Sequence, residues 1–132
     1  MNNVLKIALL LLIPAASLHA QKGAPVYSLC GKTGNATMTW DEFMSCKKEL
    51  VTTDTKLSVG SYIVTLTKAE KKDTTYIEFP VKGNVFSKSA QESIEKLRKD
   101  KKLGNKVLIE AVQILESGKE ARKVPGMIIT LN

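Results

Sequence analysis

Short runs of β-branched and aromatic residues, separated by turn-forming residues at intervals of about ten positions, fill most of the chain beyond residue 60. One run places Ile77, Phe79 and Val81 on the same face and predicts a strand with one apolar face. Pro80 cannot donate to a sheet ladder, so it marks a sheet edge or the end of the strand. The helical segments are too few to cover both faces of a parallel sheet, so we expect a mainly β, sandwich-like fold. The expected strands are residues 61–67, 74–81, 106–115, 121–124 and 127–131, with a further edge strand at 25–30.

Two capping boxes predict short helices. Thr39 and Glu42 form the first box, in which a hydroxyl and a carboxylate satisfy amides that the first helical turn leaves free. Trp40 and Phe43 follow at helical spacing, so we expect this helix to continue to about Lys48.

The second box opens at Ser89 and has Glu92 three residues later. The helix that follows would present Ala90, Ile94 and Leu97 on one apolar face. We expect it to stop at Gly104.

The first 20 residues have the three-part organisation of a secretory signal peptide. Lys6 precedes an apolar run at 7–13, which is far shorter than the roughly 20 residues of a membrane-spanning helix. We expect cleavage after Ala20 and export from the cytoplasm, with an uncleaved signal anchor as the alternative. Cleavage would lower the net charge from +7 to +6 and remove His19, the only histidine.

Without His19, the exported chain has no side chain that ordinarily titrates near neutral pH. It also has no phosphate-binding loop, dinucleotide fingerprint, calcium loop or metalloprotease helix. Glu78 and Glu110 are the only carboxylates inside expected strands, and we interpret them as solvent-facing residues, with a carboxylate hydrolase as a remote alternative. We therefore predict a protein that is not an enzyme and has no catalytic residue, cofactor or metal ligand.

Cys30 and Cys46 are the only two cysteines. An even cysteine count in an exported chain favours a disulfide, and two thiols without histidine cannot complete a zinc site. The alternatives are two free thiols or, less favoured, a nucleophilic cysteine that would lack a base.

The densest basic stretch lies at the end of the second expected helix. Two interpretations are open: the cations form a face for an anionic partner, or they are a solvated helix end that complements the helix dipole. Export excludes a nucleic-acid role. The cations are Lys96, Arg98, Lys99, Lys101 and Lys102.

From about residue 37 onward, the order of features resembles the C-terminal domain of GldM, a family of the gliding-motility and type IX secretion machinery. The matching features are the run Thr39 to Phe43, the strand at 62–67, the segment at 79–87, the lysine-rich helix, the segment at 104–112 and the closing segment at 118–129. The resemblance implies an immunoglobulin-like β-sandwich that docks onto partner proteins of the envelope. Together with the predicted signal peptide at 1–20, it divides the chain into that signal, an extension or edge strand at 21–36 and the β-domain at 37–132.

We therefore expect an exported protein–protein interaction domain that is periplasmic, outer-membrane associated or secreted, and that has no transmembrane span in its mature form. The alternative function is a small secreted inhibitor or ligand-binding module that recognises an enzyme or an anionic envelope polymer through residues 96–102. The resemblance does not identify the partner.

Overall fold

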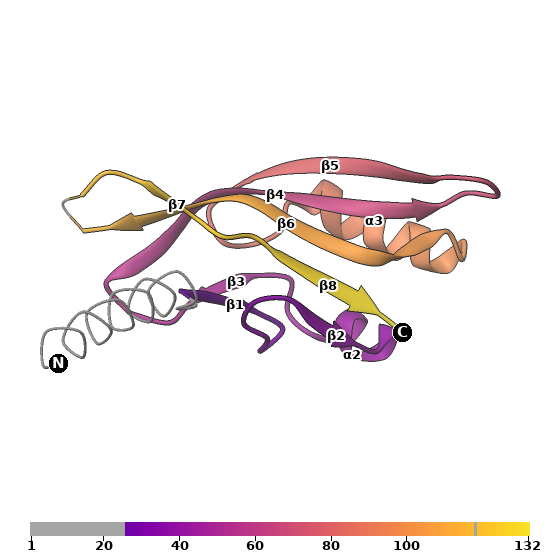
Figure 1. The fold of residues 1–132 in the computed structure, drawn as a ribbon, viewed down its shortest axis with the longest axis horizontal. Helices are drawn as coiled ribbons and strands as arrows, with labels where there is room; N and C mark the ends of the chain where they lie inside the picture. The colour runs from indigo at the N-terminus through magenta and orange to yellow at the C-terminus, as the bar shows by residue number, and fades with distance from the viewer. Residues whose placement is uncertain (1–25, 118) are drawn as a thin grey trace, which may run out of the picture.

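The computed structural model describes residues 26–117 and 119–132, and it has a six-stranded main sheet, a two-stranded sheet and two helices (Figure 1). The main sheet has the order β2-β8-β6-β4-β5, with β7 also paired to β6, and β1 pairs with β3 in the small sheet. This confirms the mainly β class with two helices. The elements are β1 (Tyr27–Leu29), β2 (Ala36–Met38), α2 (Trp40–Ser45), β3 (Leu50–Thr52), β4 (Leu57–Ala69), β5 (Thr74–Lys82), α3 (Lys88–Lys99), β6 (Leu103–Glu116), β7 (Arg122–Val124) and β8 (Met127–Leu131).

The signal peptide predicted at 1–20, with its cleavage after Ala20, lies outside the described residues. Neither described helix is long and apolar enough to cross a membrane.

Strands β4 and β6 form the centre of the main sheet, and their antiparallel pairing contains a bulge at Ala111, whose φ is +51°. The bulge adds one residue to β6 and so changes which alternate positions face the core. Before the bulge the odd-numbered Val107 and Ile109 are buried, and after it the even-numbered Val112 and Ile114 are buried. On the other side of β6, strands β7 and β8 follow one another along the same edge. Strand β6 lies inside the sheet, and β5, which contains Pro80, is an edge strand, one of the two positions that Pro80 predicted.

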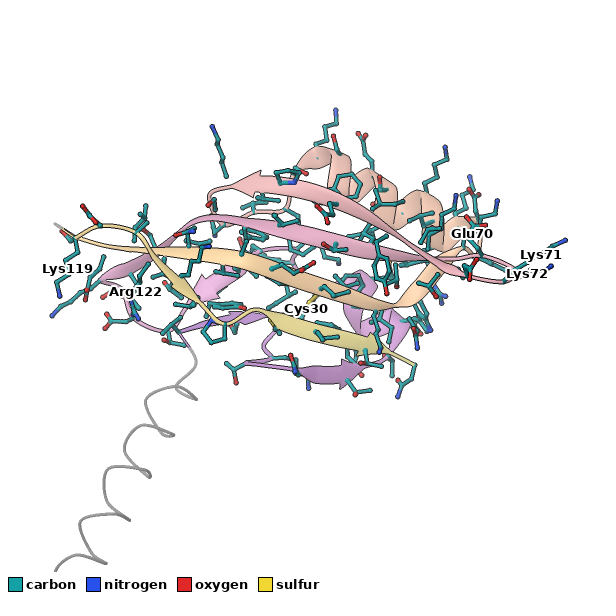
Figure 2. All side chains as sticks on the ribbon, turned by 45° about the horizontal axis from the view of Figure 1, so that its top comes forward. Cys30, Glu70, Lys71, Lys72, Lys119 and Arg122 are labelled. Carbon is teal, nitrogen blue, oxygen red and sulfur yellow. A yellow bond between two sulfur atoms is a disulfide. The ribbon has the colours of Figure 1, made fainter. Side chains whose placement is uncertain are left out.

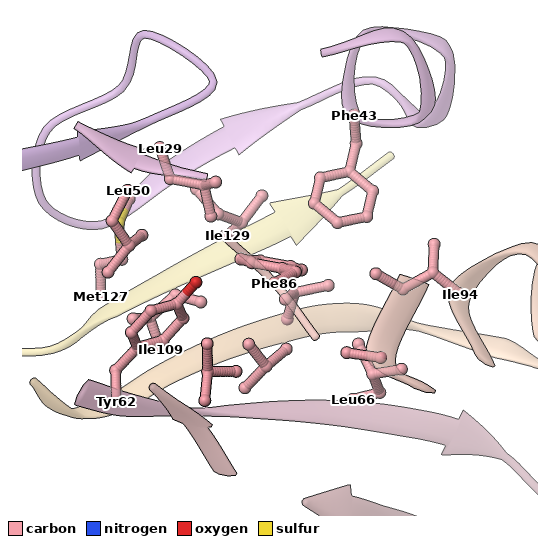
Figure 3. Packing of buried hydrophobic residues seen from close by; sticks show 14 of the residues in the cluster. Leu29, Phe43, Leu50, Tyr62, Leu66, Phe86, Ile94, Ile109, Met127 and Ile129 are labelled. Atoms are coloured by element: carbon pink, nitrogen blue, oxygen red, sulfur yellow. The ribbon is translucent and has the colours of Figure 1, made fainter. Parts of the chain in front are cut away.

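Both helices and the small sheet pack against the same face of the main sheet and enclose one apolar core (Figures 1 and 3). Figure 3 shows Phe43 of α2 and Ile94 of α3 on one side of this core and Leu66 of β4 on the other. The small sheet contributes Leu29 and Leu50, both almost fully buried. As expected, Ala90, Ile94 and Leu97 form the buried face of α3.

Cys30 and Cys46 form a disulfide that joins the turn after β1 to the end of α2, with their Cα atoms 5.4 Å apart. This confirms the predicted pairing over the two alternatives. Thr39 caps α2 as predicted, because its Oγ1 accepts a hydrogen bond from the amide of Glu42 at 3.1 Å.

Helix α2 ends at Ser45, earlier than the predicted Lys48. The chain leaves the helix at Cys46, which is extended with φ −79° and ψ 160°. The Lys48 ammonium then satisfies carbonyls at the helix end: Nζ donates to the carbonyls of Phe43, Met44 and Cys46. Burial lowers the pKa of Lys48, and the negative charge of Glu95 partly opposes this shift.

Both predicted ends of α3 were also misplaced. Its N-cap is Ser87, whose Oγ accepts from the amide of Ala90 at 3.2 Å, so the box at Ser89 does not begin the helix. The chain turns at Lys101, which takes a left-handed conformation with φ +57°. Gly104, predicted as the helix stop, lies inside β6 against Thr67.

Tyr27 should make stability fall at alkaline pH. Its hydroxyl donates to the Pro125 carbonyl at 2.8 Å, and burial raises its pKa from 10.0 to about 12. The unfolded chain loses this proton above pH 10 while the folded chain keeps it, so the contribution is complete below pH 10 and is lost as the pH rises to about 12. Burial also raises the pKa of Tyr62, whereas Lys48, with its lowered pKa, acts in the opposite direction.

The measurement is urea unfolding between pH 8 and pH 11.5, in wild type and in Tyr27→Phe. We expect Tyr27→Phe to cost about 1 kcal/mol near neutral pH, where it removes one hydrogen bond, and to flatten the alkaline loss. Equal alkaline slopes in the two proteins would show that Tyr27 does not titrate as proposed.

Candidate functional site

The five cations predicted as a binding face lie around the C-terminal end of α3. Lys96, Arg98 and Lys99 are in the last turn of the helix, and Lys101 and Lys102 are in the connection to β6. The structure does not place all five on one face. They divide between two surface hollows, one on each side of the helix end.

The first hollow, called the Trp40 hollow, has a volume of about 510 Å³. Three of the predicted cations line it, together with an aromatic ring from α2. The Arg98 guanidinium lies over the Trp40 ring, with Cζ 4.6 Å from the ring centroid, in cation–π geometry. The lining residues are Trp40, Arg98, Lys99, Lys101 and Leu103.

The second hollow, called the Lys68 hollow, has a volume of about 380 Å³. It contains the other two predicted cations, a lysine from β4 and one carboxylate. The lining residues are Lys68, Ile77, Ser93, Lys96, Leu97, Asp100 and Lys102.

The β4–β5 hairpin adds more positive charge to the same end of the molecule. The amide of Ala69 donates to the carbonyl of Lys102 at 2.8 Å, so the hairpin is joined to the connection after α3. Lys71 and Lys72 project from the tip of this hairpin (Figure 2). We call the combined surface the cationic end, formed by Lys68, Lys71, Lys72, Lys96, Arg98, Lys99, Lys101 and Lys102.

Few carboxylates neutralise the cationic end. Glu70, Asp73 and Asp100 lie in the same two connections. In the part of the chain that the structure describes, the only ion pair at this end joins Lys68 Nζ and Glu70 Oε1, at 3.3 Å. Among the described residues, none of the other seven cations has a carboxylate partner within 4 Å. Six of them are exposed, and Arg98 is half-buried over the Trp40 ring.

A second surface of interest is the face of the main sheet opposite the core, called the open face. Tyr76 of β5 is 63% exposed there and Ile128 of β8 is 36% exposed. Strand alternation places these side chains away from the core, because Ile77 and Ile129 beside them pack into it. The open face comprises Ile63, Thr65, Tyr76, Glu78, Pro80, Leu108, Glu110, Ile128 and Thr130.

The carboxylates considered for hydrolysis, Glu78 and Glu110, both lie on the open face. Thr65 stands between them: it is directly opposite Glu78 in the β4–β5 register, and its Oγ1 donates to Glu110 Oε1 at 2.6 Å. Both glutamates are exposed on a sheet surface, in agreement with the interpretation as solvent-facing residues.

A third concave region, of about 470 Å³, lies between the end of α2 and α3 and includes Cys46, Lys48 and Glu95. Its chemistry is already used by the fold, because Cys46 is in the disulfide and the Lys48 ammonium caps α2. Within the described residues, no three His, Cys, Asp or Glu side chains gather in a way that could hold a metal ion.

Sequence reasoning missed Trp40 and the β4–β5 hairpin as parts of the cationic end. Trp40 precedes Arg98 by more than fifty residues, so no local pattern connects them. In the sequence, Lys71 and Lys72 of the hairpin indicate only a charged connection between two expected strands. The chain matches no family model, and it has no match among curated proteins.

Proposed function

We propose that this chain is an exported, non-enzymatic protein–protein interaction domain of the bacterial envelope. The observation that carries the proposal is the free edge of β5 beside the open face. Strand β5 is the last strand on its side of the main sheet, and it runs over nine residues. A partner strand could pair with this edge while its side chains contact Tyr76 on the open face.

The physical basis is the set of main-chain donors and acceptors that an edge strand leaves unpaired. Adding a strand satisfies these groups, and side chains on alternate positions provide specificity. Tyr76, at 63% exposure, is the largest apolar surface available next to the edge. Tyrosine is a frequent anchor in protein interfaces because its ring is large and its hydroxyl can still form a hydrogen bond.

The resemblance to the C-terminal domain of GldM supports the envelope setting and a link to gliding motility or type IX secretion. It also supports an immunoglobulin-like arrangement within the β class. The predicted signal peptide at 1–20 agrees with a periplasmic, outer-membrane associated or secreted location.

Photo-crosslinking from the open face tests this proposal. A photoreactive amino acid is placed at Tyr76, at Ile128 or, as a control, at Lys88, the first residue of α3, whose side chain is 90% exposed. We expect one envelope protein to be crosslinked from Tyr76 and from Ile128 but not from Lys88. Crosslinks from Lys88 alone would contradict docking on the open face.

With the partner identified, Tyr76→Ala should weaken its binding by about thirtyfold, the loss expected for an aromatic anchor at an interface. Lys88→Ala should leave the affinity unchanged. Because Tyr76 is exposed, the thermal unfolding midpoint of Tyr76→Ala should stay within a few degrees of wild type. An unchanged affinity in Tyr76→Ala would exclude this side chain as the anchor.

A further inference from the structure

The positive charge at the cationic end is greater than the charge that complements the dipole of α3. Cations in the last turn of a helix complement the partial negative charge of its C-terminus, which accounts for Lys96, Arg98 and Lys99. This effect falls off within one turn and does not account for Lys71 and Lys72, which belong to the β4–β5 hairpin. Two segments that are distant in the sequence therefore contribute positive charge to one surface.

The two hollows concentrate this charge. Three cations line the Trp40 hollow, and none of its lining residues is a carboxylate. Three cations also line the Lys68 hollow, where Asp100 is the single lining carboxylate and Lys68 is itself paired with Glu70. Like charges held in a concave surface repel one another and raise the local concentration of anions. An anionic group in each hollow would relieve this repulsion.

The position of the hollows indicates the length of the ligand. They lie on opposite sides of the end of α3, and a helix with its side chains is about 10 Å across. A single small anion can occupy only one hollow at a time. A chain molecule with repeated negative groups can place one group in each hollow and pass over Lys99 and Lys102.

The surroundings favour a soluble polymer over a bilayer. The large exposed apolar side chains of the described residues are Val51, Tyr76, Val85, Leu115 and Ile128, and none of them lines either hollow. The surface therefore offers no apolar anchor for insertion into lipid.

Nucleic acid is also disfavoured. The Trp40 ring, the one aromatic ring lining the hollows, is half-buried and has the Arg98 guanidinium over one face, so it is poorly placed to stack with a base.

We propose that the cationic end binds an anionic polysaccharide whose negative groups enter the Trp40 hollow and the Lys68 hollow together. This site is separate from the open face, so the inference does not depend on the proposed protein partner.

The test uses a heparin-derived octasaccharide as the long probe and the corresponding disaccharide as the short one. Trp40 is the only tryptophan in the chain, so its fluorescence reports directly on one hollow. We expect the octasaccharide to change this fluorescence and to bind at least about tenfold more tightly than the disaccharide. Raising the salt concentration from 50 mM to 300 mM should weaken binding by about tenfold or more.

Charge-removing variants locate the site. The double variant Lys99→Ala/Lys101→Ala removes two cations from the Trp40 hollow. The double variant Lys96→Ala/Lys102→Ala removes two cations from the Lys68 hollow. Each pair should weaken octasaccharide binding by about tenfold or more. The matched control is Lys88→Ala/Lys123→Ala, which removes the same charge from exposed positions outside the hollows and should change affinity less than about threefold.

Three results would overturn the proposal. The first is no octasaccharide binding at 50 mM salt. The second is an equal loss of affinity in the control pair, which would show that binding depends on the net charge of the protein and not on the two hollows. The third is tighter binding of phosphatidylglycerol vesicles or of a single-stranded oligonucleotide with the same dependence on the four lysines, which would make lipid or nucleic acid the ligand. Tyr76→Ala serves to separate the two proposals, because it should not alter octasaccharide binding.

Discussion

Gly104→Ala is expected to lower the free energy of unfolding by about 3 kcal/mol. A Cβ atom at Gly104 would lie 2.8 Å from the carbonyl oxygen of Thr67 and 2.9 Å from its carbonyl carbon. These are backbone atoms of the central strand β4, and Thr67 is itself held in place by its hydroxyl, which donates to the Lys106 carbonyl at 2.7 Å. Relieving the contact therefore requires β4 and β6 to separate locally.

Gly60→Ala is the matched control, because Gly60 also lies in a central strand. There, a Cβ atom would meet Leu115 Cγ at 3.2 Å, and Leu115 is 41% exposed, so this contact is with a side chain at the surface and not with backbone. We expect a cost below about 1 kcal/mol, since alanine also restricts the unfolded chain. Urea unfolding followed by circular dichroism measures both variants. Similar stabilities for the two would show that β4 and β6 do not approach as closely at Gly104 as described.

Removing the disulfide with Cys30→Ala/Cys46→Ala should cost about 3 kcal/mol, the chain-entropy value for a loop of this size. The bridge spans a sequence separation of 16 and encloses β2 and α2. Helix α2 has only six residues, too few to be stable without tertiary support. The same loop contributes Met38 and Phe43 to the core, so its release also loosens buried packing.

Reductant provides the control for this pair. A thiol reagent that fully reduces the bridge should destabilise wild type by a similar amount and leave the double variant unchanged. The measurement is urea unfolding with and without the reagent, with mass spectrometry to count free thiols. If wild type keeps its stability after complete reduction, the bridge does not stabilise the fold.

Most strands could be predicted because their residue pattern is long. In β5 and β8, more exposed residues alternate with more buried ones, and this alternation is visible in the sequence. Strands β4 and β6 are recognisable as long runs rich in β-branched and apolar residues. Strands β2 and β3 have only three residues each and form because distant strands pair with them. A segment this short has no periodicity to detect, and the equally short β7 was predicted only from the turn before it and the break at Pro125 and Gly126 after it.

Turns and helix ends depended on contacts that no local pattern contains. Lys48 reaches back to the carbonyls of α2, and Lys101 takes the left-handed conformation for which glycine was expected. At the cationic end, the lysines after Lys96 were predictable as one run of charge. Their division between two hollows was not, because it depends on where α2 and the β4–β5 hairpin pack.

The parallel pairing of β2 with β8 has a consequence for the order in which the molecule can be completed. Ala36 lies opposite Ile129 and Met38 opposite Leu131, so this edge of the sheet joins residues more than ninety positions apart. The ribosome releases the earlier strand long before the later one. Until β8 emerges, β2 has no neighbouring strand, and the core that receives Met38 is incomplete. Assembly of this edge must therefore wait until synthesis has delivered β8.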